Sequence, residues 1–269
     1  MVEVKWSRLK AQDLRRLAER DAVVILPVGS IEQHGPHLPT DVDSRLGMEV
    51  ACRTARRVAE TQPTVVAPML WTGLSDHHMA FGGTFTIRPA TMMALFADLL
   101  DSLIVHGFRK VLIQNSHGGN AIAIKHVVQT LAPTSPATLV ASTYFEEAGP
   151  AISALLEDQT QLRHAEEAET SMMLAIAPEL VDDSDLGSLN EGEGPEVLRA
   201  GRASYRWRPF KHATASGIRG NPTRASAEKG ERIFEVCVAA MAALILDPAT
   251  WAPCDDRRGD SVAGVPLRR

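Results

Sequence analysis

The sequence contains little cysteine, and this limits how the protein can be cross-linked and how it can bind a metal ion. Its three cysteines, Cys52, Cys237 and Cys254, are odd in number and far apart, and none belongs to a CxxC pair. This pattern is typical of a reduced protein without a disulfide framework. We therefore predict a cytoplasmic protein in which any metal ion is bound by histidine and carboxylate side chains.

The sequence also lacks long apolar runs and an excess of positive charge. No uninterrupted apolar run reaches the ~18 residues of a transmembrane helix, and the first residues, MVEVKWSRLK, contain no apolar segment like that of a signal peptide. The formal net charge is −5. We therefore expect neither a membrane nor a nucleic acid as a partner.

Apolar runs and amphipathic segments alternate along the 269 residues of the chain. This alternation predicts an α/β fold with a mostly parallel sheet covered by helices on both faces. We expect strands at Ala22–Val28, Thr64–Met69, Lys110–Gln114 and Thr138–Thr143, and helices at Ser44–Glu60, Thr91–Val105, Asn120–Leu131 and Ala225–Leu246.

The length and the hydrophobic content of 45% predict a single domain over residues 1–269. Its core is expected from about residue 20 to residue 246. Leu186–Arg206 is rich in Gly, Glu and Arg and is predicted to be a surface loop or lid, and residues 253–269 form a polar C-terminal tail.

Histidine and carboxylate side chains follow two of the predicted strands. The first strand leads into GSIEQHGPHLPTDVD, which begins at Gly29, and the third leads into NSHGGN, which contains His117. Ligands of open parallel sheets bind beyond the carboxyl ends of the strands, so the two segments are expected to share a pocket.

The spacing within the first segment indicates which side chains face this pocket. In an extended chain, Glu32 and His34 point to the same side and Gln33 is turned away, and Asp41 and Asp43 repeat the spacing. Imidazole and carboxylate ligands without thiolates suit Zn, Mn or Fe(II). The sequence therefore predicts a metal site at this end of the sheet.

These segments resemble the creatininase (creatinine amidohydrolase) family. The resemblance covers about residues 20–245 and rests on GSIEQHGPHLPTDVD, NSHGGN and HAEEAETS, with LSDHHMAFGGT as a further family-like segment. It implies a three-layer α/β/α sandwich and a metal-dependent hydrolase of amide-type C–N bonds other than typical peptide bonds. It also implies a small-molecule substrate and a homo-oligomer, often a hexamer.

The resemblance also implies roles for individual residues. Glu32 and His117 would bind one of two divalent metal ions (Zn, Mn or Fe), His34 would bind the other, and Asp43 would bridge both. His164 matches the catalytic histidine. We expect it to protonate the leaving nitrogen after a metal-activated water attacks the substrate carbonyl.

The chain departs from creatininase itself at two neighbouring glycines. A metal-binding glutamate of creatininase corresponds to Gly119 here, and an aromatic residue corresponds to Gly118. The tryptophan of creatininase that precedes its catalytic histidine has no counterpart either. We therefore predict that creatinine is not the substrate, and that Glu169 replaces the missing ligand of the second metal ion.

The other candidate residues surround the metal ligands. Asp41 is expected to steady a ligand histidine, and Ser75 and His78 are expected to line the pocket together with Gly118 and Gly119. No serine lies in a Gly-x-Ser-x-Gly setting, so a serine nucleophile is not required.

Simpler structural roles stay open for several residues. Asp43 could be the N-cap of the helix that begins at Ser44, and His37 could be a structural hydrogen-bonding residue. Glu166 and Glu167 could be favourable charges in a first helical turn.

Other functions also stay open. A maturation peptidase, or a hydrolase that opens the ring of a sugar or lactone, could use the same dinuclear site. A non-catalytic metal-binding relative that lost one metal ion because of Gly119 is the third possibility.

Overall fold

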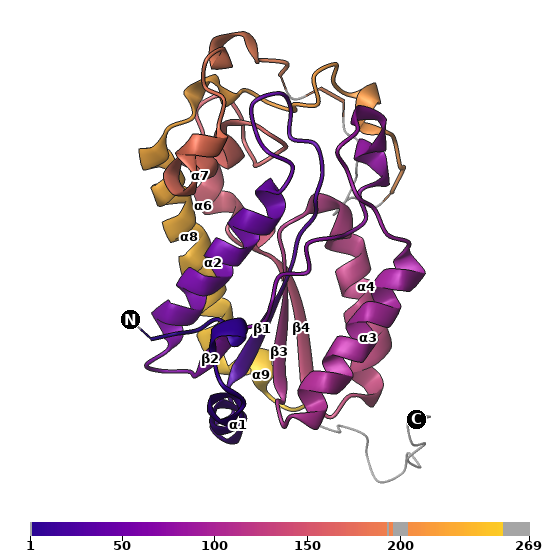
Figure 1. Cartoon of the computed structure of the whole chain (residues 1–269), viewed down its shortest axis with the longest axis vertical. Helices are drawn as coiled ribbons and strands as arrows, with labels where there is room; N and C mark the ends of the chain where they lie inside the picture. Colours follow the sequence, from indigo (N-terminus) through magenta and orange to yellow (C-terminus); the bar gives the residue numbers. More distant parts are fainter. Residues whose placement is uncertain (1, 193, 196–203, 255–269) are drawn as a thin grey trace.

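A four-stranded parallel sheet lies at the centre of the protein (Figure 1). The computed structural model describes residues 2–192, 194–195 and 204–254. The strand order is β2-β1-β3-β4, and the strands are β1 (Val23–Val28), β2 (Thr64–Val66), β3 (Lys110–Asn115) and β4 (Thr138–Thr143).

Helices cover both faces of the sheet, with α2, α7 and α8 on one side and α3 and α4 on the other (Figure 1). The longer helices are α1 (Ala11–Glu19), α2 (Val42–Val58), α3 (Pro89–Val105), α4 (Ala121–Leu131), α7 (Glu167–Ile176) and α8 (Ala227–Leu246). The short helices are α5 (Tyr144–Glu147), α6 (Gly149–Ser153) and α9 (Pro248–Trp251). The 3-10 helices are η1 (Trp6–Arg8), η2 (Asp76–Phe81), η3 (Gly118–Asn120), η4 (Ala132–Thr134), η5 (Pro178–Leu180), η6 (Leu186–Ser188), η7 (Phe210–His212) and η8 (Pro222–Arg224).

The central strands send side chains alternately into two hydrophobic clusters. In β1, Val23 and Ile25 pack into the cluster that contains α2, α7 and α8, whereas Val24 and Leu26 pack into the cluster that contains α3 and α4. Successive side chains of a strand point to opposite faces, so a strand covered on both faces must be apolar throughout. This arrangement confirms the predicted three-layer α/β/α class.

Several element boundaries differ from the prediction by one to three residues, and two of these differences affect the interpretation. β2 ends at Val66 rather than Met69, because Pro68 has no N–H to donate, although the N–H of Ala67 still donates to Ile25 O at 2.8 Å. Helix α2 begins at Val42, two residues before the predicted start, so Asp43 lies inside its first turn and is not its N-cap.

Parts of two predicted segments fall outside the described residues. These are residues 193 and 196–203 of the predicted lid and residues 255–269 of the predicted tail. Among the described residues, no helix combines the length and apolar character needed to cross a membrane.

The carboxyl ends of β1 and β3 lie next to each other, with Val28 paired to Asn115. The N–H of Ser116 donates to Val28 O at 2.9 Å, which extends the pairing by one residue. The loop after β1 and the segment around His117 therefore leave the sheet side by side, as the parallel arrangement predicts.

Candidate metal centre

Histidine and carboxylate side chains from four separate segments converge beyond β1 and β3. Each is at most 4% exposed: Glu32 and His34 from the loop after β1, Asp43 from the first turn of α2, His117 from the end of β3 and Glu169 from α7. Ionised groups are rarely buried unless they are paired or coordinate a metal ion, so this cluster requires an explanation.

Glu32, Asp43 and His117 form one group within the cluster. His117 Nδ1 lies 3.2 Å from Glu32 Oε2 and 3.1 Å from Asp43 Oδ2. The other ring nitrogen, Nε2, donates to the carbonyl of Leu74 at 3.2 Å. Because a carbonyl can only accept a hydrogen bond, Nε2 carries a proton, and Nδ1 is the nitrogen that faces the two carboxylates and can hold either a second proton or a cation.

His34, Asp43 and Glu169 form a second group. His34 Nε2 lies 3.5 Å from Asp43 Oδ1 and 3.6 Å from Glu169 Oε2, while Nδ1 donates to the carbonyl of Glu32 at 3.1 Å. Asp43 therefore presents one carboxylate oxygen to each group. Glu169, the residue predicted to replace the missing ligand, thus lies beside His34, and its Oε2 also accepts the N–H of Ala165 at 2.6 Å.

The spacing and the lack of hydrogen bonds fit two metal ions that share Asp43. Ligand atoms bound at ~2.0–2.2 Å from one ion lie roughly 3–3.5 Å from each other, close to the separations in both groups. Glu32 Oε2, His34 Nε2 and Asp43 Oδ2 are buried and have no hydrogen-bond partner among the described residues. Buried polar atoms are normally satisfied, so these three are suited to coordinate cations.

The electrostatics of the cluster also favour bound cations. Burial opposes the charged form of His34, but the carboxylates of Glu169, Asp43 and Glu32 outweigh it and raise the pKa of His34 to about 10. Burial also opposes ionisation of Asp43, yet its contacts with His117 and His34 hold its pKa well below the usual range. Three carboxylates thus create a negative site in which a metal ion can replace the histidine protons.

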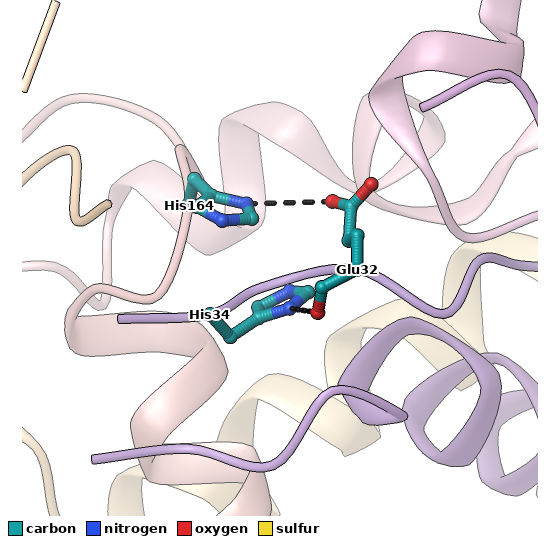
Figure 2. A group of neighbouring side chains, drawn as sticks. All are labelled: Glu32, His34 and His164. Atoms are coloured by element: carbon teal, nitrogen blue, oxygen red, sulfur yellow. Dashed lines mark hydrogen bonds and ion pairs between the residues drawn. The ribbon is translucent and has the colours of Figure 1, made fainter. Parts of the chain in front are cut away.

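His164 lies three residues before α7, outside the helix, and its ring lies over that of His34 (Figure 2). Its Nε2 donates to the carbonyl of Gln33 at 2.8 Å, so Nδ1 carries the lone pair and lies 3.6 Å from Glu32 Oε1. Burial, reinforced by the nearby His34, lowers the pKa of His164 well below its ordinary value. The neutral ring therefore presents a proton acceptor at the edge of the cluster.

Gln33 contacts the site, although the two-residue spacing predicts that it is turned away. Its Oε1 accepts the N–H of Gly35 at 2.9 Å, so its amide N–H group must face His78 Nδ1, 2.9 Å away, and the carbonyl of Gly217, 3.1 Å away. The alternation rule fails because Gly35, with φ of 66°, bends the chain into a turn instead of a strand.

The contact with Gln33 fixes the orientation of His78. Because Nδ1 of His78 accepts a hydrogen bond from Gln33, its Nε2 carries the proton and faces Glu32 Oε1 at 3.3 Å. Gln33 and His78 together therefore orient the Glu32 carboxylate. No local feature of the sequence reveals this role of Gln33, since its partners lie 45 and 184 residues away.

The structure corrects the role expected for Asp41. Its carboxylate pairs with Arg45, at 2.6 Å, and the described contacts do not join it to a candidate ligand histidine. The expectation assumed extended chain from Asp41 to Asp43, but α2 begins at Val42. Residues two apart in a helix do not share a face, so Asp41 and Asp43 are directed differently.

Ser75 and His37 lie behind the cluster. Ser75 Oγ is 3.1 Å from His117 Nε2 and 2.6 Å from Ser30 Oγ, so it supports the orientation of His117, but it is not among the described residues of the cavity wall that it was expected to line. His37 Nε2 is 2.9 Å from Thr170 Oγ1, which is the structural hydrogen bond favoured for it.

Glu166 and Glu167 have more specific roles than solvated helix charges. Glu166 is the N-cap of α7, where it accepts the N–H groups of Ala168 and Glu169. Glu167 is buried and forms an ion pair with Lys229 of α8. Neither belongs to the groups of candidate metal-ligand atoms found among the described residues.

The cluster opens into a cavity of about 650 Å³. Its wall includes His77, His78, Gly118, Gly119 and Phe210. Two neighbouring wall positions differ in the space they leave: a Cβ atom at Gly119 would overlap His117 Nε2 and the Leu74 carbonyl, whereas a Cβ at Gly118 would meet nothing within 4 Å. A glutamate cannot occupy position 119 without displacing His117.

We expect Gly119→Ala to lower the free energy of unfolding by about 1–3 kcal/mol, as overpacking does in other cores, and to lower the metal content by displacing His117. Gly118→Ala is the matched control and should change stability by less than about 1 kcal/mol. Denaturant unfolding and metal analysis of both variants test this. Equal behaviour of the two variants would contradict it.

The fold and the buried cluster together define an α/β protein with a candidate metal centre at the carboxyl end of its sheet. The creatininase family model, described as creatinine amidohydrolase, matches residues 7–245. The chain therefore belongs to the creatininase family.

Named relatives in this family are hydrolases with different substrates. The chain is 32% identical over 238 residues to the mycofactocin precursor peptide peptidase of Mycobacterium ulcerans (strain Agy99), covering 87% of each protein. It is 30% identical over 258 residues to the creatinine amidohydrolase of Pseudomonas putida, covering 89% of this chain and 93% of the relative. It is 28% identical over 276 residues to the 3-dehydro-scyllo-inosose hydrolase of Thermotoga maritima, covering 91% and 83%.

Solved structures of creatininases share the fold. One creatininase crystal structure aligns with a TM-score of 0.75 at 28% identity, covering 94% of this chain and all of that one. A structure described as creatininase Mn aligns with a TM-score of 0.74 at 29% identity, covering 91% and 98%. A mutant creatininase of Zn-Zn type aligns with a TM-score of 0.73 at 29% identity, covering the same shares. The chain is thus a family member distinct from creatininase itself.

Proposed function

We propose that this protein is a metal-dependent hydrolase that cleaves an amide-type C–N bond with a water molecule activated in the buried cluster. The observation that supports this best is the convergence of Glu32 Oε2, His34 Nε2 and Asp43 Oδ2, which are buried and lack hydrogen-bond partners among the described residues. Such atoms are costly in a folded protein unless they bind a ligand.

Glu32, Asp43 and His117 would hold one divalent ion, and His34, Asp43 and Glu169 would hold the other, with Zn, Mn or Fe as the candidates. When bound, such ions lower the pKa of water and polarise a substrate carbonyl. The protein fixes the histidines through their second nitrogens, which donate to the carbonyls of Leu74 and Glu32.

His164 would move the proton that the reaction requires. Its Nε2–H is held by the carbonyl of Gln33, so proton transfer takes place at Nδ1. The neutral ring can accept a proton from the attacking water and pass it to the leaving nitrogen, which leaves poorly without protonation. Glu32 Oε1, 3.6 Å from Nδ1, would stabilise the charged ring between the two steps.

Phe210 shields this proton-transfer group. Its ring centroid lies 4.8 Å from that of His164 and 4.3 Å from that of His78. An apolar ring at these distances limits contact between the imidazoles and bulk water, which agrees with the lowered pKa of His164.

A peptidase that matures a precursor peptide is the second candidate function. The cavity of about 650 Å³ has room for a ligand larger than one small cyclic amide. The relatives that are 32% identical to the chain are named mycofactocin precursor peptide peptidases. The same metal centre would then act on an amide bond of a peptide.

We expect protein purified without chelator to contain nearly two equivalents of Zn, Mn or Fe per chain, because two groups of ligand atoms share Asp43. Elemental analysis measures the metal, and hydrolysis of a panel of cyclic amides, formamides and short peptides should require it. Chelation should abolish the activity, and metal addition should restore it. A metal-free protein that cannot be reloaded would exclude this function.

A further inference from the structure

His77 is a buried histidine beside the candidate metal centre, and the two proposed ligand sets do not include it. It belongs to η2 and is only 4% exposed, yet it lines the cavity wall. Its ring contacts those of His78, His117 and Phe210, but neither ring nitrogen has a hydrogen-bond partner among the described residues. Buried polar atoms normally have a partner, so the imidazole of His77 is suited to bind a ligand from the cavity.

A ring nitrogen of His77 lies close to two of the candidate metal ligands. One ligand atom from each of Glu32, His77 and His117 can be chosen so that all three lie within 4.8 Å of one another. Atoms bound at ~2.0–2.2 Å to one ion are roughly 3–4.4 Å apart, depending on the angle between them. The three atoms can therefore share one ion with at most a small adjustment of the side chains.

One short segment positions both histidines. The ring of His117 donates from Nε2 to the carbonyl of Leu74 at 3.2 Å, and His77 follows Leu74 by three residues. The N–H of Leu74 in turn donates to Asn120 Oδ1 at 2.9 Å. The rings of His77 and His117 are nearly parallel, with 15° between their planes and 5.6 Å between their centroids. These contacts hold the two imidazoles in a fixed relation, as ligands of one ion require.

We propose that His77 is a further ligand of the ion that Glu32, Asp43 and His117 would hold. The proposal rests on the metal centre of the proposed function and assigns it one more residue. This ion would then have four protein ligands, two of them imidazoles. Such a set is complete for a tetrahedral ion, as in sites where the metal is held firmly.

The added ligand makes the two ions unequal. The second ion would have three protein ligands, His34, Asp43 and Glu169. Catalytic sites typically have three protein ligands and an open position for water or substrate. That open position would lie beside His164, whose ring centroid is 4.2 Å from that of His34. The first ion therefore serves to hold the site together, and the second lies next to the proton-transfer group.

The test is metal binding by His77→Phe, which keeps an aromatic ring next to His117 and Phe210 but removes both ring nitrogens. The wild-type protein should bind two Co²⁺ ions with unequal affinities, measured by competition with a coloured chelator. In His77→Phe the tighter site should lose roughly tenfold or more in affinity. The visible absorption of the Co²⁺-loaded protein should also change, because it depends on the number and geometry of the ligands.

His126→Phe is the matched control. It makes the same substitution at an exposed position of α4 outside the cavity wall, and should leave the Co²⁺ affinities and the absorption unchanged. If His77→Phe does not fold, His77→Ala gives the same comparison with a smaller side chain on the cavity wall.

Unchanged affinity and absorption in the His77 variant would overturn the proposal, even with reduced hydrolysis, because His77 would then contact the water or the substrate instead of the metal. In that case the protein would still bind two ions, and the proposed function would stand. Wild-type protein that binds no Co²⁺ would overturn both this proposal and the proposed function.

Discussion

Asp43→Asn is expected to abolish hydrolysis and to lower the metal content of the protein. Asp43 presents Oδ2 to His117 at 3.1 Å and Oδ1 to His34 at 3.5 Å, so both groups of ligand atoms depend on it. An asparagine supplies only one good donor atom, and its amide N–H group would face a cation. Elemental analysis and the amide hydrolysis assay measure the two effects.

Asp41→Asn is the matched control for this substitution. It makes the same chemical change two residues earlier, where the carboxylate pairs with Arg45 at the start of α2. A surface ion pair of this kind contributes at most about 1 kcal/mol to stability. This variant should keep both metal ions and full activity. If the Asp43→Asn variant also keeps both ions, Asp43 does not bridge two metal ions.

The position of the site could be predicted from the sequence because it depends on strand ends. A parallel sheet brings the carboxyl ends of neighbouring strands to one edge, and the pairing of Val28 with Asn115 does this for the two segments. The apolar character of β1 along its whole length also indicated a strand buried on both faces. These features follow from periodicity, which is visible in a single sequence.

The supporting contacts could not be predicted in this way. Gln33 reaches His78 and Gly217 only because Gly35 turns the chain. The ion pair between Glu167 of α7 and Lys229 of α8 joins residues that are 62 positions apart in the sequence. The direction of the Asp41 side chain depends on whether α2 begins at Val42 or at Ser44. This difference is smaller than the uncertainty with which helix ends can be predicted from sequence.

The glycine at position 119 limits which residue can complete the proposed second metal site. A side chain there would displace His117, so the remaining ligand of the proposed second metal ion would have to come from elsewhere. Glu169 of α7 has the required position, with Oε2 at 3.6 Å from His34 Nε2. Burial raises the pKa of Glu169 to about 7 against the opposing attraction of His34, so a bound cation would draw the carboxylate into its charged form.

We therefore expect Glu169→Gln to lose about one metal equivalent and most of the hydrolytic activity, because His34 and a shared Asp43 would be the only ligands left for the second ion. Removing one charged ligand or its support commonly weakens metal binding by about 10–100-fold or more. Elemental analysis after dialysis, together with titration of the metal-depleted protein, would separate the weak site from the intact one.

Glu166→Gln is the control that makes this result specific to the ligand. Glu166 is buried and lies three residues before Glu169, and its variant makes the same Glu-to-Gln replacement. Its oxygens, however, accept the N–H groups of Ala168 and Glu169 as the cap of α7. Loss of this cap should cost about 1 kcal/mol of stability and leave two metal ions bound. If Glu169→Gln and Glu166→Gln both keep two ions, another residue or water completes the second site, and the assignment of Glu169 is wrong.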